Sequence, residues 1–145
     1  MKIEEFEFPD DLLYTKEHLW VKIEDGKARV GFTDLGQAFY KGIMHIDLPS
    51  VGEKFRLGDE ISTFETIKSV SKINSPLSGK ITRINENLKD NPEIINEDPY
   101  GKGWLFEIKM ESPEEKEQLM GIEKAAPLFK EIIKREKERY AYLYE

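Results

Sequence analysis

Short runs of β-prone side chains, separated by turn signals, dominate the pattern of apolar and polar positions between residues 19 and 109. In several runs apolar and polar residues alternate, which is typical of a strand with one face in a core. Asp25-Gly26, between the first two runs, is a strong hairpin signal. Many short strands at close spacing predict a small sandwich or barrel that is mainly β. The expected strands are 19–23, 28–32, 43–48, 60–67, 69–73, 81–84 and 104–109.

Trp104 opens the last of these runs, in alternation with Phe106 and Ile108, and its ring is expected in the core. The preceding stretch, 85–103, is rich in Asn, Asp, Pro and Gly and is expected to be irregular. A loop of that length is either functional or packed down by its own side chains. For Asp98-Pro99-Tyr100-Gly101 we favour a turn-rich loop held by Trp104.

Helix signals appear at two places along the chain. A Thr33-Asp34 cap predicts a short helix through Phe39. After residue 111 helix signals replace strand signals. Ser112, Pro113 and Glu115 are typical of a capped helix N-terminus, and Gly121 of its end.

A second C-terminal helix is expected to open at Pro127. Its apolar stripe is thin in the middle, where residues 134–139 are all charged. We therefore expect residues 1–111 to form a β domain with an N-terminal extension. Residues 112–145 are expected to form a helical segment that packs on this domain or projects from it. The expected apolar positions are Leu128, Phe129, Ile132, Ile133, Tyr140, Leu143 and Tyr144.

Composition narrows the possible functions. At 145 residues the chain has the size of one domain with a single hydrophobic core. It contains no cysteine, which excludes disulfides, thiolate zinc sites and a thiol nucleophile of its own. The net charge of −7 argues against nucleic acid and anionic membranes as partners. An acidic surface fits docking to basic patches on partner proteins, and plain solubility explains it equally well.

No apolar stretch approaches the roughly 20 residues of a membrane helix, and the acidic N-terminus lacks the layout of a signal or transit peptide. We expect a cytoplasmic protein, and a monomer. The two histidines, His18 and His45, form no metal-ligand spacing, and no Gly-rich phosphate loop or Ser/His/Asp order stands out. Free-standing enzymatic activity is therefore not expected.

Lys68 lies between the β-prone runs 60–67 and 69–73, with almost nothing to connect them. It is therefore predicted at the tip of a hairpin. A carrier protein needs such a lysine, because its amine must be reachable by a modifying enzyme and its long stem extends the arm. An ordinary solvated hairpin lysine gives the same local pattern and, taken alone, is the more common explanation.

Six segments taken together favour a carrier lysine over an ordinary hairpin lysine, because in order and interval they closely resemble the glycine cleavage H-protein family. The resemblance runs from about Tyr14 to Ser112. Each motif is weak by itself. The segments are Tyr14-Thr15-Lys16-Glu17-His18-Leu19-Trp20, Val30-Gly31-Phe32-Thr33-Asp34, Leu48-Pro49-Ser50-Val51-Gly52, Glu65-Thr66-Ile67-Lys68-Ser69, Ser75-Pro76-Leu77-Ser78-Gly79 and Asn91-Pro92-Glu93-Ile94-Ile95-Asn96-Glu97-Asp98-Pro99-Tyr100-Gly101-Lys102-Gly103-Trp104.

The resemblance implies a barrel-sandwich hybrid, the fold of the lipoyl domains of 2-oxo acid dehydrogenases. Lys68 falls on the family's lipoylated lysine, so the implied cofactor is lipoate in amide linkage to Lys68. Glu65 falls on the acid that precedes this lysine by three residues. Biotin carriers share the fold but resemble a Met-Lys-Met tip, which Ile67-Lys68-Ser69 lacks.

For function, the resemblance implies a carrier that contributes no catalytic residue. In the family, lipoamide accepts an aminomethyl group from glycine after glycine decarboxylase, the P protein, has acted. Aminomethyltransferase, the T protein, releases the methylene group and ammonia, and dihydrolipoyl dehydrogenase, the L protein, reoxidises the dithiol. A lipoate ligase or lipoyl transferase attaches the cofactor. A cysteine-free chain is consistent with a carrier that leaves the chemistry to its cofactor and to other enzymes, because lipoamide brings the reactive sulfur.

His18 lies in a stretch that resembles the family, where a role in lining a cleft beside the arm and a packed structural role are both open. His45 is expected to be an ordinary strand residue. Tyr40-Lys41-Gly42 departs from the family's usual Leu-Gly-Asp, and residues 131–144 look longer and more basic than the usual C-terminal helix. These departures concern docking surfaces and leave two alternatives open. One is an H-like carrier of sulfur intermediates for a heterodisulfide-reductase-like system, and the other is an unmodified scaffold or lipoyl-relay protein.

Overall fold

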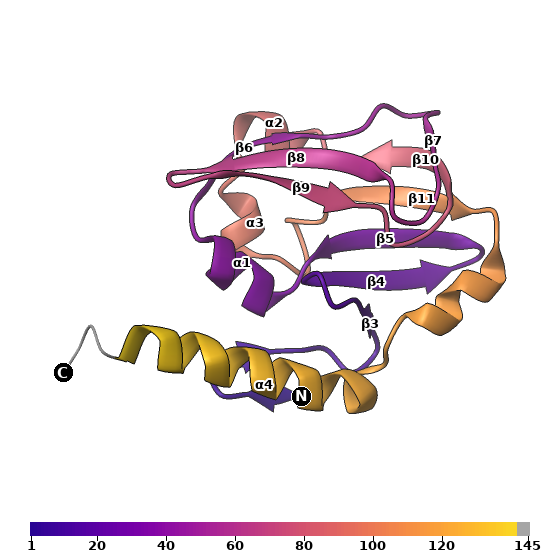
Figure 1. The fold of residues 1–145 in the computed structure, drawn as a ribbon. Helices are drawn as coiled ribbons and strands as arrows, with labels where there is room; N and C mark the ends of the chain where they lie inside the picture. The colour runs from indigo at the N-terminus through magenta and orange to yellow at the C-terminus, as the bar shows by residue number, and fades with distance from the viewer. Residues whose placement is uncertain (142–145) are drawn as a thin grey trace.

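The computed structural model describes residues 1–141, in which a six-stranded and a three-stranded β-sheet pack together (Figure 1). A two-stranded N-terminal sheet, short helices and one longer C-terminal helix lie around them. The strands are β1 (Lys2–Ile3), β2 (Phe6–Glu7), β3 (Leu13–Tyr14), β4 (Leu19–Glu24), β5 (Lys27–Phe32), β6 (Ile43–Asp47), β7 (Lys54–Phe55), β8 (Glu60–Thr66), β9 (Val70–Asn74), β10 (Gly79–Ile84) and β11 (Phe106–Met110). The helices are α1 (Asp34–Tyr40), α2 (Asn87–Asp90), α3 (Ile94–Glu97), the 3-10 helix η1 (Pro113–Gln118) and α4 (Ile122–Ala141).

The larger sheet has the strand order β3-β4-β5-β11-β10-β7, and the smaller sheet has the order β6-β8-β9. All of these pairings are antiparallel. Both sheets contribute to one apolar cluster, in which Phe32 and Phe106 of the larger sheet and Phe64 of the smaller are fully buried. The prediction of a mainly β fold with short helices and a C-terminal helical segment is therefore confirmed.

The β4–β5 hairpin forms where the sequence predicts it. Asp25 has a φ of 51° and Gly26 a φ of 75°, so both central residues of the turn are left-handed. That conformation is the one a two-residue type I′ turn requires, and it matches the twist of the two strands.

The stretch 85–103, expected to be irregular, contains the one-turn helices α2 and α3. Leu88 and Ile95 project from these turns into the core and are fully buried. The side-chain amide of Asn85 donates to the carbonyls of Lys102 (2.7 Å) and Trp104 (2.8 Å), which joins the start and the end of the stretch. The loop is therefore packed down by its own side chains.

The N-terminal strands and α4 form a second apolar cluster on the far side of the larger sheet from the β8–β9 hairpin (Figure 1). The Phe8 ring stacks on Phe129 at 4.6 Å between centroids, and Tyr14 meets both rings edge-on. The Lys137 ammonium donates to Glu5 at 3.0 Å. Within residues 1–141, no helix is both long and apolar enough to cross a membrane. The side chain of Tyr140 and all of Leu143 and Tyr144 lie outside the described residues.

The predicted capping box after residue 111 is wrong. Ser112 makes no side-chain cap, and the helix it precedes is a short 3-10 helix. The Glu115 carboxylate, expected to complete the box, instead accepts hydrogen bonds from the amide and the hydroxyl of Ser78, both at 2.8 Å. Two charge-assisted bonds to a neighbouring loop outweigh one local cap. Gly121 does not end this helix, since its carbonyl accepts the Ala125 amide at the start of α4.

The second helix begins five residues earlier than predicted, so Pro127 lies inside α4. Ile122, Ala125 and Ala126 are buried in the second cluster, and this burial favours the helix upstream of the proline. Pro127 itself is exposed. The carbonyl of Glu123, which would normally accept the missing amide hydrogen of Pro127, can therefore be hydrated.

Trp20, and not Trp104, is the core tryptophan. Trp20 is 2% exposed, and its Nε1 donates to the Pro99 carbonyl at 2.9 Å. The ring that holds the loop at 98–101 is therefore that of Trp20, which corrects the sequence-based expectation. Trp104 is only half-buried, and the Arg29 guanidinium lies 4.4 Å from its ring centroid. Residue 104 precedes β11, so strand alternation does not direct its ring inward.

We predict that Trp20→Ala lowers the free energy of unfolding by about 3–5 kcal/mol, because it empties a packed site and removes the bond to Pro99. Trp104→Ala should lower it by about 1–2 kcal/mol, since a half-buried ring and its arginine contact are lost. Urea unfolding of both variants measures the difference. Equal losses, or a larger loss for Trp104→Ala, would contradict the placement of the two rings.

Candidate functional site

Lys68 lies at the tip of the β8–β9 hairpin, as predicted. Residues 67–69 connect the two strands, and the Thr66 amide donates to the Ser69 carbonyl at 2.9 Å to close the turn. The hairpin extends beyond the rest of the smaller sheet at one end of the molecule (Figure 1). Lys68 is exposed, and its ammonium forms no ion pair within the part of the chain that the structure describes.

Thr66 fixes the backbone of this tip, a role that the sequence reasoning missed. Its Oγ1 accepts hydrogen bonds from the amides of Lys68 (3.3 Å) and Ser69 (3.2 Å). A threonine hydroxyl that bonds to amides two and three residues ahead is a known turn-forming arrangement, so Thr66 two positions before the lysine was the available signal. The backbone at Lys68 is held, while the side chain is free to move.

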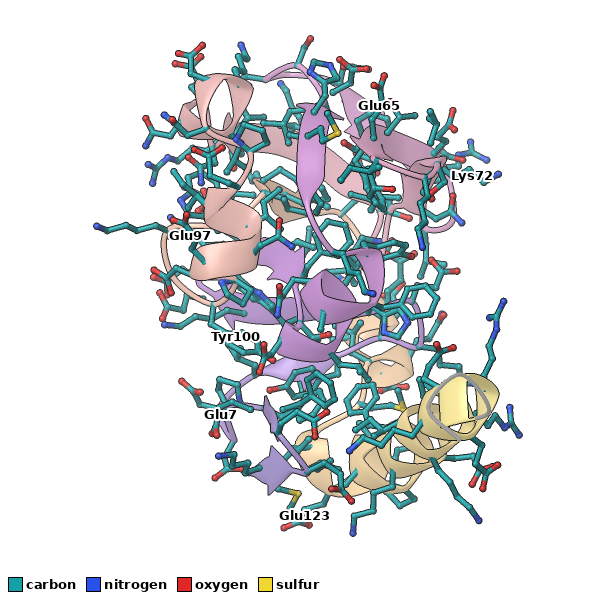
Figure 2. The ribbon with its side chains drawn as sticks, turned by 90° about the vertical axis from the view of Figure 1, so that its left-hand side faces the viewer. Glu7, Glu65, Lys72, Glu97, Tyr100 and Glu123 are labelled. Atoms are coloured by element: carbon teal, nitrogen blue, oxygen red, sulfur yellow. The ribbon has the colours of Figure 1, made fainter. Side chains whose placement is uncertain are left out.

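Glu65 lies on β8 beside the tip, directly opposite His45 of β6 and Val70 of β9. It is exposed, and Figure 2 shows it with Lys72 at the end of the molecule opposite Glu123. The structure therefore brings Glu65 and Lys68 to the same hairpin end.

Exposed apolar side chains surround the tip, and the sequence reasoning did not identify them as site residues. Ile67 is 82% exposed and Val70 is 71% exposed. Met44, 62% exposed, lies where the β6–β8 register shifts opposite Thr66 and Glu65. Such residues at a protruding end form a surface that a partner protein can cover.

His18 adopts a φ of 70°, just before β4, and its ring is largely buried. The ring stacks on Phe39 at 5.4 Å and meets Tyr40 edge-on at 6.2 Å between centroids. Its Nδ1 is buried and has no hydrogen-bond partner in the part of the chain described. Burial lowers the pKa of His18 below its usual 6.5, so the ring is neutral at pH 7.

Two aromatic rings link His18 to the base of the hairpin. Tyr40 packs against Phe64 at 4.7 Å, and Phe64 lies on β8 four residues before Lys68. Among the described residues, no hydrogen bond or ring contact joins His18 directly to Lys68 or Glu65. His18 is thus linked to the base of the hairpin through Tyr40 and Phe64, and not to its tip.

His45 is a strand residue of β6, as predicted. Its Nε2 lies 2.9 Å from the Asp47 carboxylate, and this hydrogen bond holds the pKa of Asp47 below its usual range. Both side chains are exposed. Within residues 1–141, no group of three histidine or acidic side chains is placed to hold a metal ion.

The two-sheet fold and the tip lysine define a lipoyl-domain-like β protein that presents one lysine on a protruding hairpin. The comparisons with known proteins narrow this class. The model of the family "Glycine cleavage H-protein" matches residues 12–132. The chain belongs to the glycine cleavage H-protein family, whose members are carrier subunits.

Individual relatives agree with this assignment. The chain is 41% identical over 136 residues to glycine cleavage system H protein 4 of Aquifex aeolicus, covering 94% of this chain and 80% of the relative. It is 50% identical over 97 residues to the H protein of Herpetosiphon aurantiacus, covering 67% and 75% of the two chains. The crystal structure of the H protein from Mycobacterium marinum superposes with a TM-score of 0.77 at 31% identity, over 83% of this chain and 98% of that one. The expected barrel-sandwich hybrid fold is thereby confirmed.

The lowered pKa of His18 predicts a pH dependence of stability. As the pH falls through 6.5, the unfolded chain takes up a proton on this residue before the folded chain does. The free energy of unfolding should therefore decrease from about pH 7 downward, until the pH passes below the lower pKa of the folded state. His18→Asn, which tolerates the left-handed backbone, should remove this decrease.

Urea unfolding between pH 5 and pH 7.5, with an NMR titration of the two histidine rings, tests this prediction. His45→Asn serves as the control, because it changes the exposed ring and leaves the buried one. If the wild-type and His18→Asn stabilities run parallel across this range, the neutral buried ring is not the cause.

Proposed function

We propose that the chain is a lipoyl carrier of the glycine cleavage system, with lipoate in amide linkage to Lys68. The observation that supports this proposal is that an exposed lysine lies at a hairpin tip whose backbone is held by hydrogen bonds. In this proposal, residues 1–111 form the carrier domain and residues 112–145 a helical segment associated with it. The protein acts in the cytoplasm as a non-catalytic monomer.

The residues at the tip fit this cofactor. A modifying enzyme must reach the Lys68 amine, and neither an ion pair nor burial competes for it in the described part of the chain. Thr66 holds the backbone and so limits the conformations that a lipoate ligase or lipoyl transferase must recognise. Glu65 offers that enzyme an exposed carboxylate three residues before the lysine.

Lipoate on Lys68 would supply the dithiolane sulfurs that the cysteine-free chain lacks, and with them a disulfide that can be reduced as it takes up an aminomethyl group. The chain itself presents the arm to the P, T and L proteins in turn. Ile67, Val70 and Met44 provide apolar area around Lys68 for these contacts. His18 can line the path of the arm from the side of α1, where its neutral ring carries an unpartnered Nδ1. These roles of Glu65 and His18 are part of the proposal.

The two alternative functions lack comparable support. The relatives named above carry the glycine cleavage name, which favours aminomethyl transfer over the transport of sulfur intermediates. An unmodified scaffold would not require the fixed backbone and free side chain seen at Lys68.

We predict that Lys68→Arg abolishes lipoylation and carrier activity, because a guanidinium cannot form the amide. The substitution should change the free energy of unfolding by less than about 0.5 kcal/mol, since the tip is exposed. Peptide mass spectrometry after incubation with lipoate ligase, lipoate and ATP measures the first effect. Glycine-dependent turnover with the P, T and L proteins measures the second.

Lys72→Arg is the matched control, because Lys72 is also exposed and lies four residues further on β9. It should retain one lipoyl group and full turnover. Lipoylation at Lys72 instead of Lys68 would refute the assignment of the attachment site, and an unmodified wild-type chain under the same conditions would refute the proposed carrier function.

A further inference from the structure

The solvent face of the larger sheet carries two rows of charged side chains in direct cross-strand register. The first row consists of Lys22, Arg29, Glu107 and Arg83 on β4, β5, β11 and β10. The second consists of Glu24, Lys27, Lys109, Lys80 and Lys54 on β4, β5, β11, β10 and β7. Ala28 and Ile108, which lie between the rows, are buried, so both rows point outward. We call these nine residues the basic face.

The basic face differs in charge from the rest of the protein. It holds seven of the chain's 22 basic residues and two of its 29 acidic residues, a local charge of +5 in a chain of net charge −7. Both acids are already paired, Glu24 with Lys22 at 3.5 Å and Glu107 with Arg29 at 3.6 Å. Within residues 1–141, the four lysines of the second row form no ion pair.

Folding does not account for this arrangement. Like charges directly opposite each other on neighbouring strands destabilise a sheet. Lysines protect an exposed sheet edge from aggregation, and this explains the presence of Lys54 on the edge strand β7. Edge protection does not explain Lys27, Lys80 and Lys109, because their strands β5, β10 and β11 are each paired on both sides. A row of unpaired lysines on three interior strands therefore points to an interaction outside the chain.

The basic face lies at the opposite end of the β structure from the Lys68 tip. Lys27 is at one end of β5, and Phe32 at the other end contacts Phe64 of β8, at 5.2 Å between ring centroids. Five residues of strand separate these ends by about 17 Å. The hairpin tip lies beyond Phe64 in the other direction, and the β4–β5 turn and the tip mark opposite sides of the molecule in Figure 1. A partner on the basic face can thus leave the tip uncovered.

We propose that the basic face binds a patch of aspartate and glutamate side chains on a partner protein, while the Lys68 tip stays free. The lysines of the second row stand roughly 4.8 Å apart, one strand spacing. The Cβ atoms of acidic residues at positions i and i+4 of a helix stand about 5–6 Å apart, so the spacing of an acidic helix face matches that of the row. This inference goes beyond the proposed function and does not depend on lipoylation.

Charge distribution favours a protein over a longer polyanion. At physiological salt, electrostatic interactions are screened beyond about 8 Å. A small acidic patch docked on the basic face therefore interacts mainly with its local charge of +5. A nucleic acid or an anionic membrane extends past the face and meets the acidic remainder of the chain. The nine residues are all charged, which suits a salt-dependent, rapidly exchanging contact rather than a permanent interface.

The test uses the full-length chain and a peptide of eight glutamates as the probe. Amide NMR shifts at low salt should map to β5, β7, β10 and β11 and not to the hairpin tip. The triple variant Lys27→Gln, Lys80→Gln, Lys109→Gln should weaken binding by about tenfold, and wild-type binding should fall steeply with added salt. Lys109→Gln alone gives a smaller loss in the same direction and serves if the triple variant folds poorly.

The matched control is Lys89→Gln, Lys124→Gln, Lys130→Gln, which removes three exposed lysines from α2 and α4. It changes the net charge equally and should leave peptide affinity within about twofold of wild type. Equal weakening in both triple variants, or no shift on the basic face at low salt, would overturn the proposal. Tighter binding of a short RNA duplex or of phosphatidylserine vesicles through the same lysines would overturn the choice of a protein partner.

Discussion

Three aromatic rings hold together the parts of the molecule on which the site depends. Phe64 of the smaller sheet meets Phe32 of the larger sheet at 5.2 Å and Tyr40 of α1 at 4.7 Å, and Phe32 and Tyr40 are 5.6 Å apart. This contact fixes the base of the hairpin that presents Lys68 against the larger sheet, together with the buried isoleucines of the smaller sheet. One of these rings, Tyr40, also positions His18, which packs against Tyr40 and Phe39. The protruding end of the molecule is therefore rigid at its base and free at its last side chain.

Sequence patterns predicted those parts of the fold that local interactions determine. Asp25-Gly26 specifies its own turn through two positive φ angles, and Thr33 caps α1 through its own hydroxyl. The tip at Lys68 follows from the two strand patterns on either side. In each case a few neighbouring residues provide both the signal and the interaction.

Predictions were wrong where distant residues compete with a local signal. Glu115 bonds to Ser78, 37 residues away, instead of completing a capping box. Pro127 lies inside α4 because burial of Ile122 and Ala125 favours a longer helix. Trp104 was expected to be the core ring that holds the loop at 98–101, because the bond that anchors this loop, from Trp20 to Pro99, spans 79 positions and leaves no local signal. The charge pattern was missed for the same reason, since Lys27, Lys80 and Lys109 become neighbours only in the register of the sheet.

The distribution of side chains gives the two ends of the β structure different chemistry. Around Lys68 the exposed residues include three apolar side chains, Ile67, Val70 and Met44, on three different segments. At the far end they are charged and mainly basic. Apolar contacts gain strength from close, dry packing, whereas contacts between charges act over several ångströms and weaken with salt. In the proposed function, one arm on Lys68 meets several enzymes in turn, and both kinds of contact suit that role. A salt-dependent contact far from the tip raises the local concentration of a partner without occupying the surface around Lys68.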